Sequence, residues 1–413
     1  MAKSVILRNR SLAILVGGQG VSQVGNAMNG MAISWLVLNL THSRADLGLV
    51  SAVGSAVGMA MLVSGVYVDR WNRRRTLIVA DIIRGVLMGL LVALAVIHAL
   101  SVVEVIGLVI ISGLVSTVFG PASIAFLQQI VDSTDIPSAN GVYSVVSTTS
   151  TLLGTPIGGW IISVLGPVAV FGLNGLSFLV SVVTLRWIRA PQPPVRTEEP
   201  PDPTRREFRR FWPQLVEGWD LIWHHVFLRR IVLAGMISGF GSGSLMAFEV
   251  VWVRQVLHLG AFYFGVFGLV FAGGNLIAGT LFGTLATRIA IPRLTVITLL
   301  GSGLLIIIFS QIPFLWPDLL IYLVLGTFSG LLSMGISVFL QQSVPSELLG
   351  RSFGTLAALT NGMMPLSAVL TGLVSSVVSM STVFFGAGAI IALATTMFFG
   401  LPDTTTEKQQ SAG

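Results

Sequence analysis

The chain has 413 residues, of which 54% are hydrophobic and only 10% are charged. A soluble globular protein carries nearer a quarter charged residues, so this composition indicates an integral membrane protein. Twelve helices of about 20 apolar residues would use roughly 240 residues, which fits a polytopic helical bundle. The alternating pattern of a membrane β-barrel is missing, and the absence of cysteine excludes disulfides and thiol chemistry.

The formal net charge of +6 does not predict nucleic-acid binding, because the basic residues sort by membrane side. All lysines and arginines except Arg44, Arg84 and Arg254 fall on one side of the expected spans. The positive-inside rule makes that side cytoplasmic and places both termini there. The two lysines, Lys3 and Lys408, lie in the tails, which excludes a phosphate-binding loop for ATP. Any transport would therefore draw on a gradient.

Apolar runs predict twelve membrane-spanning helices, the first retained and not cleaved as a signal peptide. They lie at 12–39, 46–68, 76–98, 103–128, 139–164, 167–188, 229–256, 262–286, 294–312, 318–341, 352–376 and 381–400. Residues 189–228 are rich in proline and charge, which is typical of a linker. Apolar residues recur there at helical spacing, at Phe208, Trp212, Leu215 and Trp219. This segment is either an amphipathic helix on the inner membrane surface or a solvated linker helix.

The two halves of the chain resemble each other. Trp35 matches Trp252 and Gly48 matches Gly265 at one offset of 217, while Gly113 matches Gly326 at a similar offset. An ordered set of matches predicts a six-plus-six duplication. We therefore expect an all-α membrane protein with two pseudo-symmetric six-helix bundles, 1–188 and 229–413, joined by a cytoplasmic linker at 189–228.

The loop after the second span carries a glycine, an aspartate and several arginines, namely Gly65, Asp69, Arg70, Arg73, Arg74 and Arg75. This pattern resembles the cytoplasmic loop motif of the major facilitator superfamily. The resemblance implies that Gly65, Asp69, Arg70 and Arg74 form a cytoplasmic gate, with Asp69 docked at the start of helix eleven near residue 352. A carboxylate is favoured at a helix N-terminus. The second-half copy has Thr287 in place of the aspartate, which predicts an asymmetric gate.

The fifth span contains a proline flanked by glycines, at Gly154, Pro156, Gly158 and Gly159. This segment resembles the superfamily's antiporter motif, which is associated with exporters. A proline frees a backbone carbonyl and bends a helix, so an ordinary kinked and tightly packed helix is the alternative interpretation.

Ionisable residues inside a membrane are costly and are usually functional. Asp81 and Arg84 stand three residues apart on one helix face and are expected to pair. We interpret them as a relay that supports the gate, with a proton site at Asp81 as the alternative. Glu249 is a candidate proton acceptor or counter-charge for a cationic substrate, unless it reaches the outer surface or pairs with Arg254.

Polar side chains form stripes on two helices, one with Gln19, Gln23 and Asn26 and one with Ser333 at its centre. Such stripes are expected to face a cavity or a neighbouring helix, and the resemblance favours the cavity. The proposed substrate cavity comprises Gln19, Gln23, Asn26, Met31, Phe119, Phe248, Trp252, Ser333, Asn361 and Met364, where methionine and aromatic side chains would suit varied ligands. The histidines form no spacing typical of a metal site.

Weaker matches over nearly the whole chain resemble the macrolide-efflux and enterobactin-exporter branch. They include Gly18 with Gln19, the segment 119–122, the segment 139–141 and the segment 349–351. The sequence departs from many drug antiporters at Asn26 and Asn29, where those proteins often carry an acid in helix one. The arginine-led motif of helix four is also missing. Both departures leave the coupling residue and proton coupling itself open.

The resemblance implies a secondary exporter of amphipathic drug- or macrolide-type compounds, working by alternating access and proton antiport. We expect a monomer in the bacterial cytoplasmic membrane, among lipids, with no cofactor, metal, nucleic-acid partner or enzymatic activity. A siderophore or lipid exporter and a uniporter are the alternatives within transport. A transport-inactive receptor is the alternative of another class.

Overall fold

The computed structural model describes residues 8–60, 71–188, 223, 226–344 and 346–398. Residue contacts divide the chain into two compact units. The N-terminal unit holds residues 1–203 with 259–269, and the C-terminal unit holds 204–258 with 270–413. The described residues form helices and no strands.

The helices of the N-terminal unit are α2 (Arg10–Thr41), α3 (Arg44–Met59), α5 (Arg73–Val96), α6 (Val102–Ile130), α7 (Ile136–Leu165) and α8 (Pro167–Trp187). Polar side chains set where several of them begin. Asn9, Ser43 and Asn72 each accept a hydrogen bond from a backbone N–H in the first turn of α2, α3 and α5, and such caps satisfy donors that have no partner within the helix.

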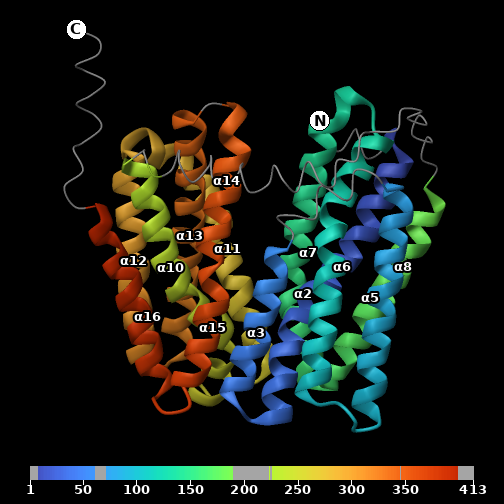
Figure 1. The fold of residues 1–413 in the computed structure, drawn as a ribbon, viewed down its shortest axis with the longest axis horizontal. Coiled ribbons are helices and arrows are strands. Elements are labelled where there is room, and N and C mark those ends of the chain that lie inside the picture. The colour runs from blue at the N-terminus through green and yellow to red at the C-terminus, as the bar shows by residue number, and fades with distance from the viewer. Residues whose placement is uncertain (1–7, 61–70, 189–222, 224–225, 345, 399–413) are drawn as a thin grey trace. The chain divides into compact units, whose positions relative to one another are not determined.

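In the N-terminal unit α2 packs against both α7 and α8, while α5 packs against α6 and α8 (Figure 1). α3 packs against α6 and α2. One apolar core joins five of these helices through Leu12, Leu77, Phe126, Val142 and Leu185. The parts of α2 and α6 that lie outside this apolar core carry the polar side chains described below.

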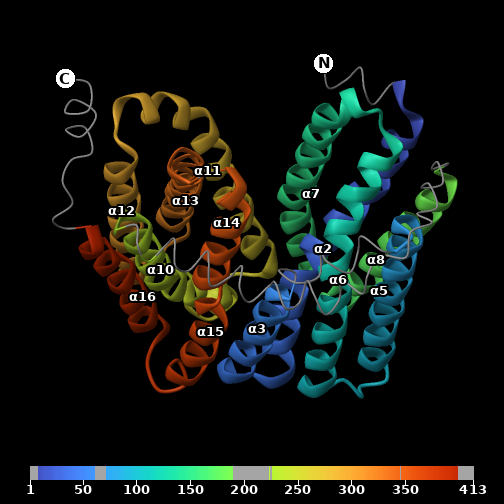
Figure 2. The ribbon, with the colours of Figure 1, turned by 45° about the horizontal axis from the view of Figure 1, so that its top comes forward.

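The C-terminal unit contains α10 (Val226–Val251), most of α11 (Ala261–Arg288), α12 (Ile291–Gln311), α13 (Leu315–Ser343), α14 (Ser346–Asn361), α15 (Met363–Val374) and α16 (Met380–Ala394). The π-helix η2 (Trp252–Val256) extends α10, and the 3-10 turn η3 (Thr395–Phe398) follows α16. α12 packs against α13 and α16, and α10 packs against α14, α15 and α16 (Figure 2).

Within the described residues the predicted spans coincide with helices, with two differences, and residues 61–68 of the predicted span 46–68 lie outside the described part. The predicted helix at 352–376 begins earlier, at Ser346, and is interrupted at Gly362, so it forms α14 and α15. The predicted helix at 229–256 changes to π geometry at Trp252, and π turns inside helices are frequently found at functional sites.

In the described part of the chain, nine helices are long and apolar enough to cross a membrane. α2, α3 and α7 are not among them. The described part of α3 has only 16 residues, and α2 carries a row of amides. Within the described residues the twelve predicted spans are thus matched in position by helices, and nine of these spans have the length and apolar character that a membrane crossing needs.

Candidate functional site

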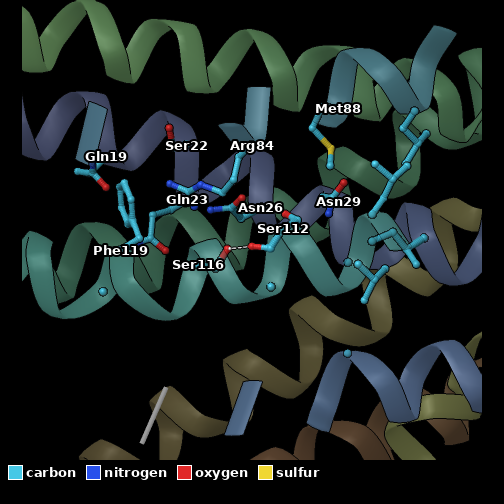
Figure 3. Close-up of a pocket in the computed structure, with 18 of the residues that line it drawn as sticks. Gln19, Ser22, Gln23, Asn26, Asn29, Arg84, Met88, Ser112, Ser116 and Phe119 are labelled. Atoms are coloured by element: carbon cyan, nitrogen blue, oxygen red, sulfur yellow. Dashed lines mark hydrogen bonds between the residues drawn. The ribbon is translucent and has the colours of Figure 1, made fainter. Parts of the chain in front are cut away.

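The N-terminal unit contains a cavity of about 440 Å³ between α2, α5 and α6 (Figure 3). Its wall is largely polar on α2 and mixed on α5 and α6. The lining includes Gln19, Ser22, Gln23, Asn26, Asn29, Arg84, Met88, Ser112, Ser116, Phe119 and Tyr143. A cavity with a few polar groups among apolar ones is typical of a site for a small organic ligand.

The amide stripe of α2 lines this cavity. Gln23 and Asn26 keep exposed surface, whereas Gln19 is buried and donates from Nε2 to Ser181 Oγ of α8 at 3.2 Å. Asn29 continues the stripe by one more turn, and its Oδ1 is buried without a hydrogen-bond partner in the described part of the chain. The 3.6-residue periodicity thus brings Gln19, Gln23 and Asn26 together.

The opposite wall comes from α6. Phe119 contributes an aromatic ring there, and Ser116 turns its hydroxyl back to donate to the Ser112 carbonyl at 2.8 Å. Phe119, one of the predicted cavity residues, lies in this lining. Ser112 and Ser116 belong to the same wall.

Asp81 and Arg84 form a buried ion pair on α5, as their spacing predicts, with Arg84 Nη2 donating to Asp81 Oδ1. The Arg84 guanidinium carbon lies 4.0 Å from the ring centroid of Phe119 and 4.5 Å from that of Phe178. Asp81 is fully buried and lies outside the cavity lining, whereas Arg84 lines it. The spacing of the two residues predicts their pairing but does not indicate that Arg84 reaches the cavity.

Of the predicted gate, Gly65, Asp69 and Arg70 lie outside the described residues, as does most of the predicted amphipathic segment at 208–226. Arg74 is described and contacts the C-terminal end of α8. Its Nε donates to the Leu185 carbonyl at 2.8 Å and its Nη2 to the Arg186 carbonyl at 2.5 Å. A cation that satisfies terminal carbonyls stabilises a helix end.

Arg74→Ala is expected to lower the free energy of unfolding by about 1–2 kcal/mol, because two hydrogen bonds from a charged donor are lost. The midpoint of thermal unfolding of the purified protein in detergent measures this change. Arg75→Ala is the matched control, since Arg75 is the next residue and its side chain is exposed. Equal midpoints for the two variants would contradict the capping role.

The glycines of the predicted antiporter motif lie where α7 crosses α2. A Cβ added at Gly154 would lie 2.7 Å from the Val24 carbonyl oxygen, and one added at Gly158 would lie 2.9 Å from the Met28 Cα. Gly159 faces the first turn of α11 within the same unit, with an added Cβ 2.5 Å from the Ala261 carbonyl oxygen. Only glycine permits such backbone approach.

Pro156 stands inside α7 and cannot donate to the carbonyl four residues earlier. That carbonyl belongs to Leu152, and the hydroxyl of Thr155 donates to it at 3.4 Å. A neighbouring side chain therefore partly satisfies the carbonyl that proline frees, as is common where proline interrupts a membrane helix.

The other residues predicted for the cavity lie outside its lining. Met31 is buried away from the cavity lining, and Phe248 and Trp252 are completely buried in the C-terminal unit. Ser333 and Asn361 are exposed, on α13 and at the end of α14, and Met364 is partly buried against α10 beside Gly243. Met31 belongs to the N-terminal unit and the other five residues belong to the C-terminal unit.

Trp252 lies in an aromatic cluster of the C-terminal unit. Its ring centroid is 4.6 Å from that of Phe309 and 5.4 Å from that of Phe384. Its indole Nε1 donates to Asp318 Oδ2 at 2.9 Å, which links η2 to the start of α13. A buried tryptophan usually finds such a partner for its N–H.

Asp318 is a buried acid that sequence reasoning missed. It follows Trp316 and Pro317 and is the first residue of the predicted span 318–341. In the structure it is 0% exposed, and its Oδ1 has no hydrogen-bond partner among the described residues. A signal was present, since an aspartate directly inside an apolar run is costly unless it is held by a partner.

Glu249 lies on α10 of the same unit. The Tyr322 hydroxyl of α13 interacts electrostatically with both carboxyl groups. Glu249 Oε1 is shielded from solvent and has no hydrogen-bond partner in the described segments. The C-terminal unit therefore brings two acids and a tyrosine to one place beside the π-helix.

No group of three or more histidine, cysteine, aspartate or glutamate side chains in the described ranges is placed to hold a metal ion. The polar chemistry of the described residues thus gathers at the amide-lined cavity of the N-terminal unit and at the acidic cluster of the C-terminal unit.

A family model for the Major Facilitator Superfamily matches residues 15–368. The chain belongs to this superfamily. The resemblance identified from the loop motif is thereby confirmed, and with it a multi-pass membrane transporter, not an enzyme.

Relatives of known name are distant but nearly full length. The multidrug efflux pump Tap of Mycolicibacterium fortuitum is 25% identical over 376 residues, covering 84% of this chain and 85% of that protein. The enterobactin exporter EntS of Citrobacter koseri is 23% identical over 355 residues, covering 85% and 82%. Homology to efflux pumps therefore supports drug efflux in general terms.

Solved structures show the same fold. The nucleoside transporter NupG superposes with a TM-score of 0.75 at 12% identity, covering 95% of this chain and 100% of that one. A bacterial homologue of the human lysosomal transporter Spinster, inward-facing and unoccupied, superposes with a TM-score of 0.69 at 14% identity, covering 94% and 96%. At such identities the likeness concerns the fold alone.

Proposed function

We propose that this chain is a secondary exporter of amphipathic organic compounds, driven by proton antiport. The observation that carries the proposal is the cavity of about 440 Å³ lined by amides, hydroxyls and aromatic rings in a chain of membrane-type helices. Such a lining suits ligands with both polar and apolar parts. The similarity to multidrug efflux pumps supports the direction of transport.

The proposed architecture has twelve spans in two six-helix halves, 1–188 and 229–413, with the cytoplasmic linker 189–228 between them. Alternating access would proceed by movement of one half against the other. The distribution of the basic residues supports a cytoplasmic location for both termini, and the bacterial relatives favour the cytoplasmic membrane of a bacterium. We propose that the transporter works as a monomer.

The proposed gate comprises Gly65, Asp69, Arg70 and Arg74, supported by the Asp81–Arg84 pair. The close packing of α7 on α2 at Gly154 and Gly158 would give the N-terminal half a rigid wall on which gating acts. Glu249 is the first candidate for the coupled proton, with Asp81 as a second. The remaining proposed cavity residues do not line the N-terminal cavity and would contact the substrate elsewhere in the molecule or in another conformation. They are Met31, Phe248, Trp252, Ser333, Asn361 and Met364.

Siderophore export is the second candidate function. It is favoured by the similarity to an enterobactin exporter and by a cationic side chain in the cavity lining. Export of a lipid and facilitated diffusion without coupling have no such specific support.

Transport into everted vesicles tests the proposal. Vesicles that contain the protein are expected to accumulate a macrolide or another amphipathic probe, and a protonophore is expected to abolish accumulation. Vesicles from cells without the protein serve as the control. Accumulation that ignores the protonophore would defeat proton coupling, and no accumulation of any probe would favour a transport-inactive receptor.

A further inference from the structure

Arg84 is a buried cation with few partners. It is 3% exposed and lines the cavity of the N-terminal unit (Figure 3). A guanidinium carries five N–H donors, yet in the described part of the chain Arg84 makes one hydrogen bond, from Nη2 to Asp81. Its Nε is buried without an acceptor. Unsatisfied buried donors are rare and point to a missing partner.

The surroundings of Arg84 direct its remaining donors. The rings of Phe119 and Phe178 lie over the guanidinium at 4.0 and 4.5 Å. Rings in such positions interact with the face of a cation, and the N–H groups lie in the guanidinium plane. An acceptor that reaches this plane from the cavity would find N–H donors that no group in the described part of the chain accepts from.

Among the described residues that line the cavity, Arg84 is the one charged side chain, and no acid belongs to this lining. Its partner Asp81 lies behind the lining, fully buried. The neighbouring polar groups are neutral amides and hydroxyls, which can donate or accept. Asn29 adds an amide whose Oδ1 has no partner in the described segments.

We propose that Arg84 binds an acidic oxygen of the transported compound, so that the cavity selects amphipathic organic acids over amphipathic cations. A carboxylate can engage a guanidinium through two parallel hydrogen bonds, which gives both affinity and orientation. The apolar side chains Met88 and Phe119 would contact the apolar part of the same molecule. This inference rests on the proposed function, because it takes the cavity as the place where the substrate binds.

The test uses probes that share the pyrene and its alkyl chain and differ in the head group: 1-pyrenebutyrate, its methyl ester and the corresponding trimethylammonium compound. Binding to the purified full-length protein in a neutral detergent is measured by energy transfer from tryptophan to pyrene. The wild type is expected to bind the carboxylate about tenfold more tightly than the ester or the ammonium. Equal or tighter binding of the ammonium compound would overturn the proposal.

Variants assign the preference to Arg84. Arg84→Gln is expected to reduce the carboxylate preference to less than about twofold, and Arg84→Lys to retain part of it, because lysine keeps the charge but not the planar fork. Arg75→Gln removes an exposed cation from the same helix and is expected to match the wild type. A preserved preference in Arg84→Gln would contradict the role of Arg84.

Arg84→Gln could fail to fold, because it leaves the buried Asp81 carboxylate without its partner. Asp81→Asn therefore provides a second measurement, in which removal of the competing carboxylate is expected to tighten carboxylate binding. Unchanged or weaker binding in Asp81→Asn would count against the proposal. The neutral detergent excludes anionic lipid as the bound acid.

The two proposals fail separately. Charge-selective binding that depends on Arg84, without accumulation in vesicles, would overturn the exporter function alone. Proton-dependent accumulation without any carboxylate preference would overturn the present inference alone.

Discussion

Glu249→Gln is expected to lower efflux driven by a pH gradient about tenfold. A loss of this size corresponds to a typical coupling free energy between two ligands, here the proton and the transported compound. The reason is that Glu249 has a shielded oxygen without a hydrogen-bond partner in the described part of the chain and interacts electrostatically with Tyr322, as Asp318 does. A carboxyl group placed in this way can take up and release a proton, whereas an amide cannot. Substrate binding and gradient-free exchange should persist.

The measurement is uptake and efflux in vesicles with an imposed pH gradient, beside counterflow without a gradient. Glu104→Gln is the control, because Glu104 is an exposed acid that caps α6 through Ser101. Asp318→Asn keeps an acceptor oxygen for the Trp252 indole and tests whether the neighbouring acid takes part in coupling. Wild-type uptake and efflux in Glu249→Gln would remove that residue from the mechanism.

Gly158→Val is expected to lower the free energy of unfolding by about 3 kcal/mol or more, at the upper end of the range for overpacking. An added Cβ would lie 2.9 Å from the Met28 Cα, and a backbone atom cannot move aside as a side chain can. Transport should fall in parallel, because α7 and α2 would have to separate. Thermal unfolding and vesicle transport measure the two effects.

Gly141→Val is the matched control for this substitution. Gly141 lies on the same helix, and nothing lies within 4 Å of a Cβ added there. The two variants share the same change in helix propensity and differ only in packing. Similar unfolding midpoints would show that the close approach of α7 and α2 does not limit stability.

Several features of the fold could be predicted because they depend on short-range sequence patterns. The positions of the helices follow from runs of apolar residues, and the Asp81–Arg84 pair follows from a spacing of three on one helix. The amide stripe of α2 follows from helical periodicity, and the structure brings Gln19, Gln23 and Asn26 to one cavity with Phe119.

Asp318 and Arg84 could not be placed in this way. Asp318 is adjacent in sequence to a loop-like Trp–Pro pair, and its partner Trp252 is 66 residues away. Arg84 pairs within its own helix, but only the packing of α5 on α6 and α8 brings it to Phe119 and Phe178. Such contacts depend on how each helix is rotated about its axis, which a single sequence does not specify.

The sequence by itself determined that the protein is a helical membrane transporter of the major facilitator type, because composition, apolar run length and the loop motif are written along the chain. Only the tertiary structure decided which polar groups meet: a guanidinium at the cavity of one unit, and two acids with a tyrosine in the other. The physical reason is that burial and hydrogen bonding are properties of packed helices, since an apolar environment is created by neighbours distant in sequence.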